Sequence, residues 1–229
     1  MNIQGYQKLT LLDFPGRVAC TVFTGGCNLR CPFCHNAGLV RTPFSLANSE
    51  EELLSYLASR RTLLDGVCVT GGEPLLQSDL PAFLRKLREM GYAVKLDTNG
   101  SLPDRLQELL ATGLVDYVAM DVKSSPQGYA AATGREGDVT PFLQSIRLLK
   151  ESGIPHEFRT TVVKGIHTAA DIDEIGKLLA GSTRYFLQPF RDSGNLLGHG
   201  CSAFSEAEMS AFLDIAKKYI PAAELRGQG

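Results

Sequence analysis

Three cysteines stand close together in the sequence. Cys27, Cys31 and Cys34 form a C-x3-C-x2-C run that directly follows Gly25 and Gly26. With this spacing in one loop, three thiolates can reach a single metal centre. A cubane [4Fe–4S] cluster has four irons, so three cysteine ligands leave one iron free to bind a substrate or cofactor. The run therefore predicts a [4Fe–4S] cluster whose vacant iron is its functional feature.

Zinc is the main alternative for this run. His35 would complete a Cys3His set, which is a known structural zinc site. However, His35 directly follows Cys34, which makes joint chelation of one ion awkward, and no second C-x2-C half is present. Three unligated thiols in a loop would be prone to oxidation. A second metal at His199 and Cys201 is disfavoured, because two ligands do not complete a site.

Glycines follow a second apolar segment, in Thr70-Gly71-Gly72-Glu73-Pro74. Glycine lets the backbone approach a ligand closely, and carbonyls at a strand end can accept hydrogen bonds from an ammonium group. Taken alone, the segment is also compatible with a simple strand-to-helix turn, in which Pro74 favours the first helical turn.

Two further polar segments follow apolar ones. Asp97-Thr98-Asn99-Gly100 is typical of an Asx turn, in which Asp97 is alternatively an outward-facing cap. In Asp121-Val122-Lys123 the two charged side chains project to the same side of an extended segment. They form either a ligand-binding pair or a solvated surface pair of little energetic value.

Two arginines complete the candidate site residues. Arg159 alternates with apolar neighbours, so it either lines a barrel interior or forms an outward ion pair. Its planar guanidinium suits a carboxylate. Arg191 ends the segment Gln188-Pro189-Phe190-Arg191, which follows the last predicted strand.

Apolar segments rich in β-branched residues alternate with amphipathic ones along the chain. The predicted strands are 17–23, 66–69, 93–96, 117–120, 157–163 and 185–187. The predicted helices are 50–59, 80–90, 104–111, 141–151, 170–179 and 206–219, with capping boxes at Ser49/Glu52 and Ser205/Glu208. Such alternation implies right-handed βαβ crossovers, and six units predict a partial (βα)6 TIM-like barrel of parallel strands with outer helices. Every motif above then lies at or near a carboxyl end of a strand, where such folds carry their chemistry.

Composition narrows the class of protein. The 229 residues, 44% hydrophobic and 21% charged, predict a single globular domain over residues 1–229. A net charge of −2 makes nucleic acid and anionic membranes poor partners. The N-terminus has no signal-peptide core, and no apolar run approaches the ~20 residues that span a bilayer. We therefore expect a cytoplasmic protein.

At the level of motifs the chain resembles a known superfamily. The C-x3-C-x2-C run, with Phe33 before its last cysteine, resembles the signature of radical S-adenosylmethionine enzymes. The segments 12–16, 22–27 and 34–36 resemble the activating enzymes of glycyl radical enzymes. The segments 5–8 and 31–36 look most like anaerobic ribonucleoside-triphosphate reductase activating proteins.

The resemblance gives each motif an expected role. It implies that Cys27, Cys31 and Cys34 hold the cluster and that Phe33 lies at the cofactor. The remaining residues implied to contact S-adenosylmethionine are Gly71, Gly72 and Glu73 around the methionine amino group, Thr98 and Asn99 beside the cofactor, Asp121 and Lys123 at its amino acid end, and Arg159 and Arg191. Pyruvate formate-lyase activators typically have a histidine where Arg191 stands, so this departure favours the reductase activators.

The resemblance also implies the reaction. A reduced [4Fe–4S] cluster would cleave S-adenosylmethionine, and the resulting 5′-deoxyadenosyl radical would take a hydrogen from a glycine of a partner, the anaerobic ribonucleotide reductase. A flavodoxin- or ferredoxin-type protein would be the reductant. The alternatives are an activator of pyruvate formate-lyase or another glycyl radical enzyme, a radical enzyme acting on a small molecule, and an iron–sulfur sensor or electron carrier. The long segment 123–139 is the expected docking loop for the partner.

Overall fold

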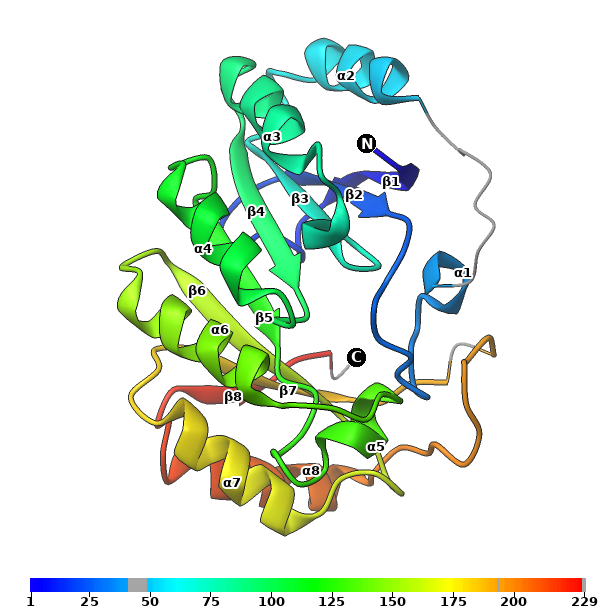
Figure 1. The fold of residues 1–229 in the computed structure, drawn as a ribbon, viewed down its shortest axis with the longest axis vertical. Helices are drawn as coiled ribbons and strands as arrows, with labels where there is room; N and C mark the ends of the chain where they lie inside the picture. Colours follow the sequence, from blue (N-terminus) through cyan, green and yellow to red (C-terminus); the bar gives the residue numbers. More distant parts are fainter. Residues whose placement is uncertain (41–48, 193, 228–229) are drawn as a thin grey trace.

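The computed structural model describes residues 1–40, 49–192 and 194–227. Its centre is one eight-stranded sheet in which the strands follow one another in chain order (Figure 1). Strand β1 pairs with β2 antiparallel, and every later pair is parallel. The strands are β1 (Ile3–Thr10), β2 (Ala19–Thr24), β3 (Gly66–Gly71), β4 (Ala93–Thr98), β5 (Tyr117–Asp121), β6 (His156–Val162), β7 (Tyr185–Pro189) and β8 (Ala223–Leu225).

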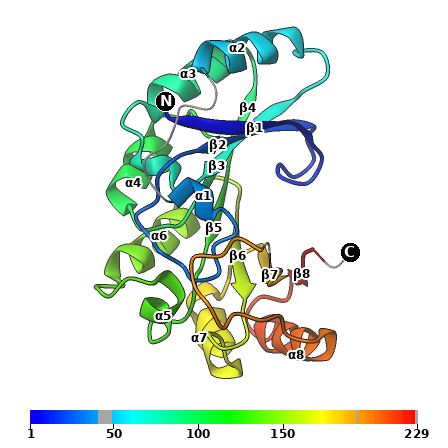
Figure 2. The ribbon, with the colours of Figure 1, turned by 90° about the vertical axis from the view of Figure 1, so that its right-hand side faces the viewer.

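Helices connect the parallel strands and cover the outside of the curved sheet, whereas the short helix α1 lies on its other side (Figures 1 and 2). The helices are α1 (Ala37–Val40), α2 (Glu50–Ser59), the 3-10 turn η1 (Pro74–Leu76), α3 (Leu80–Glu89), α4 (Pro103–Ala111), α5 (Tyr129–Thr133), α6 (Thr140–Glu151), α7 (Ala169–Leu179) and α8 (Glu206–Lys217). Among the described residues, no helix is long and apolar enough to cross a membrane.

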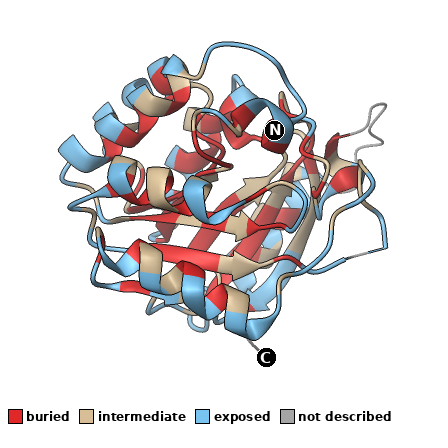
Figure 3. Cartoon of the chain, turned by 90° about the horizontal axis from the view of Figure 1, so that it is seen from below, coloured by how far each residue is buried: buried red, intermediate tan, exposed pale blue. Residues whose placement is uncertain are grey.

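Side-chain alternation explains how the sheet separates a core from a site. On β4, Val94 and Leu96 belong to the main hydrophobic core, whereas Lys95 and Asp97 point to the opposite face of the strand. On β6, Phe158 joins the core and Arg159 takes the opposite face. Figure 3 shows the buried strands enclosed by helices whose outer surfaces are exposed. One face of the sheet therefore packs on helices, and the other encloses a polar interior.

Local signals fix the helix ends. Capping boxes begin α2 at Ser49 and α8 at Ser205, as predicted, and a third begins α7 at Thr168. In α3, Phe83, Leu84 and Leu87 are buried, so this helix packs on the sheet through one apolar side.

The predicted α/β fold with parallel strands and outer helices is confirmed, and its strand count is corrected. All six predicted strands are present, but β1 and β8 extend the sheet to eight. These two outer strands are not neighbours in the sheet order, so the barrel is open between them. The segment 123–139, which is expected to be the docking loop, contains the short helix α5.

Candidate functional site

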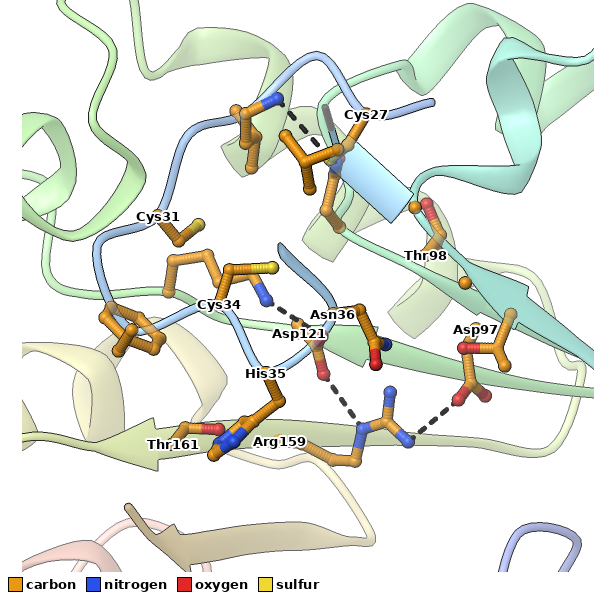
Figure 4. A pocket seen from close by; sticks show the side chains of 18 of the residues that line it. Cys27, Cys31, Cys34, His35, Asn36, Asp97, Thr98, Asp121, Arg159 and Thr161 are labelled. Carbon is orange, nitrogen blue, oxygen red and sulfur yellow. Dashed lines mark hydrogen bonds and ion pairs between the residues drawn. The ribbon is translucent and has the colours of Figure 1, made fainter. Parts of the chain in front are cut away.

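A cavity of about 260 Å³ opens at the carboxyl ends of the parallel strands. It is lined by the cysteine loop and by strand-end residues of β3 to β7, which the fold brings together from distant parts of the chain (Figure 4). Of the predicted site residues, it is lined by Cys27, Cys31, Phe33, Cys34, Gly71, Gly72, Thr98, Asn99, Asp121, Lys123 and Arg159. The topology thus assembles most of the predicted site.

The three cysteines surround one end of this cavity. Cys31 is buried, Cys27 and Cys34 are partly buried, and all three thiols are free. Burial raises the pKa of Cys31 to about 11 and also raises that of Cys27. Thiols in such surroundings ionise readily only when a metal centre takes up their charge. Three thiols around one hollow fit a cubane cluster, which is larger than a single ion.

The geometry supports neither zinc at the cysteine run nor a second metal at His199 and Cys201. Among residues 1–40, 49–192 and 194–227, no three His, Cys, Asp or Glu side chains are placed to hold a single metal ion. The ring of His35 lies 5.8 Å from that of Phe190, and burial lowers its pKa. Cys201 packs at the edge of the apolar cluster that supports the cysteine loop.

Three neighbouring segments hold the cysteine loop by its backbone. The N–H of Glu73 donates to the carbonyl of Gly26 at 2.7 Å, and the N–H of Arg30 donates to that of Thr133 at 2.8 Å. On its far side, the N–H of Gly198 donates to the carbonyl of Pro32 at 2.9 Å. The second of these contacts comes from α5, so segment 123–139 supports the cysteine loop.

Five charged side chains form an alternating row across β4, β5 and β6. Lys95 pairs with Asp97, whose Oδ2 lies 3.1 Å from Nη1 of Arg159. Arg159 donates from Nε to Oδ1 of Asp121 at 2.9 Å, and Oδ2 of Asp121 accepts from Nζ of Lys123 at 2.9 Å. Figure 4 shows Arg159 between the two carboxylates. Asp97 therefore faces inward, which rules out the outward-facing cap.

The row keeps its members ionised. Burial alone would raise the pKa of Asp121, but Arg159 and Lys123 hold it well below its usual value. Likewise, burial opposes the charge of Lys123, yet Asp121 raises the pKa of its ammonium group. Asp121 and Lys123 are only partly exposed, so they do not form the solvated surface pair considered from the sequence. Arg159 lines the cavity and therefore does not form an outward ion pair. Both signs of charge therefore face the cavity in fixed positions.

Glu73 departs from the expected direct contact with the cofactor. Its side chain is 0% exposed and does not line the cavity. One carboxyl oxygen accepts from the N–H of Leu75 at 3.0 Å and the hydroxyl of Thr98 at 2.9 Å, and the other accepts from the N–H of Asn99 at 2.7 Å. Glu73 thus joins the Gly71-Gly72 turn to the end of β4, and the turn itself lines the cavity through Thr70, Gly71 and Gly72.

Gly71 and Gly72 are required by close backbone approach. Gly71 has φ +119°, and a Cβ on it would lie 2.2 Å from the N of Thr24. A Cβ on Gly72 would lie 1.9 Å from the carbonyl oxygen of Gly26, at the start of the cysteine loop. No larger residue fits at either position without backbone movement.

Arg191 also lies outside this cavity. It lines a neighbouring hollow of about 750 Å³, together with Leu12 and Arg226, and donates to the carbonyl of Gly227 at 2.6 Å. The two hollows share His35, Arg159, Thr161 and Gln188. The cavity at the cysteines therefore continues toward the β1–β2 loop and the C-terminal segment.

Sequence reasoning missed several residues of the site. Thr161 and Gln188 line the cavity, and Lys95 lies buried at one end of the charged row. Strand alternation carried the signal, because Lys95 shares a face with Asp97 and Thr161 with Arg159.

A family comparison matches residues 21–179 to the Radical SAM superfamily, a span that includes the cysteine run and the charged row. The chain belongs to this superfamily. Radical S-adenosylmethionine enzymes use a [4Fe–4S] cluster and S-adenosylmethionine, so the predicted cofactors are confirmed for this chain.

The related proteins carry more than one named activity. The chain is 31% identical over 227 residues to a putative glycyl-radical enzyme activating enzyme of Methanocaldococcus jannaschii, covering 95% of this chain and 92% of the relative. It is 33% identical over 140 residues to the pyruvate formate-lyase-activating enzyme of Clostridium pasteurianum, covering 58% of each. A third relative, the 7-carboxy-7-deazaguanine synthase of Methanopyrus kandleri, is 33% identical over 148 residues and 56% of each chain.

Solved structures share the fold. Streptococcus suis SuiB bound to S-adenosylmethionine superposes with a TM-score of 0.71 at 15% identity, covering 88% of this radical SAM chain and 48% of SuiB. A domain of the pyruvate-formate lyase-activating enzyme from Bacteroides vulgatus superposes with a TM-score of 0.58 at 22% identity, covering 71% of this chain and 99% of that domain.

Proposed function

We propose that this radical SAM protein is a glycyl radical enzyme activating enzyme, acting through one domain over residues 1–229. The observation that carries the proposal is the likeness to the activating enzyme of M. jannaschii, which extends over 95% of the chain. The activating-enzyme motifs 12–16, 22–27 and 34–36 support it from the sequence.

Each part of the cavity receives a proposed task. Cys27, Cys31 and Cys34 would hold the cluster, whose thiolate ligands leave one iron open. Asp121 and Lys123 would bind the ammonium and carboxylate of the methionine end, because a zwitterion needs both signs. Residues that line the remaining walls and would enclose the cofactor are Phe33, Gly71, Gly72, Thr98, Asn99 and Arg159. The chemistry that the bound cofactors supply is one-electron reductive cleavage of the sulfonium.

The shape of the open side of the barrel supports the proposal that the substrate is a protein. Beyond the cavity lies the larger hollow, whose rim includes Leu12, and Leu12 is 85% and Leu11 68% exposed. Leucines this exposed at the mouth of a site favour contact with another macromolecule. A partner loop entering there would bring its glycine toward the cofactor, as the reaction requires.

The finer proposal is that the partner is the anaerobic ribonucleotide reductase and that a flavodoxin- or ferredoxin-type protein supplies the electron. Its support is the likeness of 5–8 and 31–36 to the reductase activators, together with arginine in place of histidine at Arg191. Arg191 would act at the partner side, since it lines the outer hollow. Activation of pyruvate formate-lyase is the alternative, favoured by the relative from C. pasteurianum.

The test compares partners directly. The reconstituted protein is incubated anaerobically with S-adenosylmethionine, a reductant and either the anaerobic reductase or pyruvate formate-lyase. A glycyl radical signal in electron paramagnetic resonance on the reductase alone is the expected result, and a partner whose radical glycine is replaced by alanine is the control. A radical only on pyruvate formate-lyase would overturn the finer proposal. Cofactor cleavage coupled only to turnover of a small heterocycle would overturn the activating role itself.

A further inference from the structure

His167 lies behind the site rather than in it. It belongs to the segment between β6 and α7 and is 3% exposed. Its Nδ1 accepts from the backbone N–H of Val163 at 3.0 Å, which leaves Nε2 to carry the proton. Nε2 then donates to the backbone carbonyl of Lys123 at 2.8 Å. The ring is therefore neutral and held as one tautomer.

The same ring also contacts the cysteine loop. Phe33, which stands between Cys31 and Cys34, meets His167 edge-on with 6.2 Å between the ring centres. Val163 packs in the same apolar cluster as Cys31 and Phe33. One buried side chain thus joins the Lys123 backbone to the loop that carries the cysteines.

The segment after β5 is fixed from the same side at a second point. The hydroxyl of Thr160 donates to the carbonyl of Val122 at 2.8 Å, and the N–H of Val122 donates to the carbonyl of Arg159 at 2.7 Å. These bonds hold Val122, whereas the bond from His167 holds the next residue, Lys123, whose ammonium faces the cavity.

We propose that His167 is a positioning residue for S-adenosylmethionine, which sets the place of Lys123 relative to the cysteine loop. The proposal rests on the assignment of Lys123 to the methionine end made above. A cofactor bound between Lys123 and the cluster contacts both at once, so a shift of either weakens the other contact. His167 acts through Lys123 and Phe33 and does not itself line the cavity.

The test removes the two hydrogen bonds of His167 and keeps an aromatic side chain at this position. His167→Phe removes both and leaves the Val163 N–H and the Lys123 carbonyl unpaired. We expect about four irons per chain after reconstitution, but S-adenosylmethionine bound roughly tenfold more weakly, comparable to the loss of one buried hydrogen bond. His167→Gln, which keeps one donor and one acceptor, should restore most of the affinity.

His156→Phe is the matched control. His156 also bonds a backbone carbonyl, that of Ile154 at 2.8 Å, and meets Phe158 edge-on with 5.3 Å between the ring centres, but it does not line the cavity. This variant should lower the melting temperature without changing cofactor affinity. Affinity is measured by titration calorimetry and by the change that the cofactor causes in the paramagnetic resonance spectrum of the reduced cluster.

Three results would overturn the proposal. In the first, His167→Phe binds the cofactor as tightly as the wild type. In the second, His156→Phe weakens binding equally, which would make His167 an ordinary core histidine. In the third, Lys123→Ala binds the cofactor as tightly as the wild type. Lys123 would then have no role in binding for His167 to support, whereas the proposed activation of a glycyl radical enzyme would still stand. If His167→Phe fails to fold, His167→Leu, which also removes both hydrogen bonds, decides: weakened cofactor binding with full iron content supports the role, and wild-type affinity refutes it.

Discussion

Replacement of Glu73 by glutamine tests how the two motif turns are held together. Glu73 is buried and accepts hydrogen bonds from Leu75, Thr98 and Asn99. Burial raises the pKa of its carboxyl from 4.5 to about 7, although these three donors partly oppose the rise. The folded protein therefore holds this proton more tightly than the unfolded chain does.

The sign of the pH dependence follows from that difference. Stabilisation by the protonated carboxyl is fully present below about pH 4.5 and is lost as the pH rises through about 7. The whole difference is worth roughly 3 kcal/mol in the free energy of unfolding, and roughly 2 kcal/mol of it falls between about pH 5.5 and about pH 8.

Glu73→Gln removes this titration. Its amide must also turn a donor toward the N–H of Asn99, which costs roughly 1–3 kcal/mol at the lower pH. The stability advantage of the wild type over the variant should therefore shrink by roughly 2 kcal/mol from about pH 5.5 to about pH 8. Anaerobic denaturant unfolding at both pH values measures it.

Glu157→Gln is the control for this experiment. Glu157 is equally buried, but Arg226 pairs with it and, against the effect of burial, lowers the pKa of its carboxyl. Its stabilisation is lost only as the pH falls through that lowered pKa, so its advantage should stay constant from about pH 5.5 to about pH 8. A constant advantage for Glu73 as well would refute the burial argument.

Three further outcomes are expected. Cys31→Ala should abolish the cluster and Cys20→Ala should leave about four irons per chain, as measured by iron analysis, and a cluster that survives Cys31→Ala contradicts the ligand assignment. Gly134→Ala should lower iron content, because Gly134 has φ +62° and a Cβ there would lie 2.2 Å from the carbonyl oxygen of Arg30; full iron content would show that α5 does not support the cysteine loop. Ser205→Ala should cost about 1 kcal/mol of stability by denaturant unfolding, through loss of the α8 cap, with cofactor affinity unchanged.

Local patterns predicted the parallel part of the fold well. Helix α2 has the predicted bounds, and every strand from β2 to β7 overlaps a predicted one. Helix caps and apolar periodicity predicted these elements, and both are local signals that do not depend on distant residues. The meeting of the cysteine run with the strand-end motifs could also be predicted, because parallel strands bring their carboxyl ends to one edge of the sheet.

The two outer strands lacked such signals. In β1 the middle residues are partly or fully exposed, so apolar and polar residues do not alternate strictly along its sequence. Strand β8 has only three residues and forms by pairing with β7 at the far end of the sheet. Edge strands of this kind depend on a partner that the sequence does not place.

The orientation of Glu73 and Asp97 depended on contacts across the sheet. Glu73 turns away from the cavity because Thr98 and Asn99, which end β4, offer donors behind the turn. Asp97 turns inward because Lys95 precedes it on the same face and Arg159 reaches it from β6. The spacing within one motif does not reveal such partners. Asp97 and Arg159, for example, are 62 residues apart in the sequence.

The charged row is better explained by binding than by stability. Moving charged groups out of water costs free energy that their mutual attraction often fails to return. Five paired charges inside a barrel therefore stabilise the fold less than well-packed apolar side chains would. The row holds three cations, Lys95, Arg159 and Lys123, against two carboxylates, Asp97 and Asp121. One positive charge is therefore unbalanced. Lys123 ends the row beside the cysteine loop and lines the cavity, so it is the cation that we propose to bind a ligand. A carboxylate bound there would continue the alternation of signs, which gives the buried charges a purpose that folding alone does not.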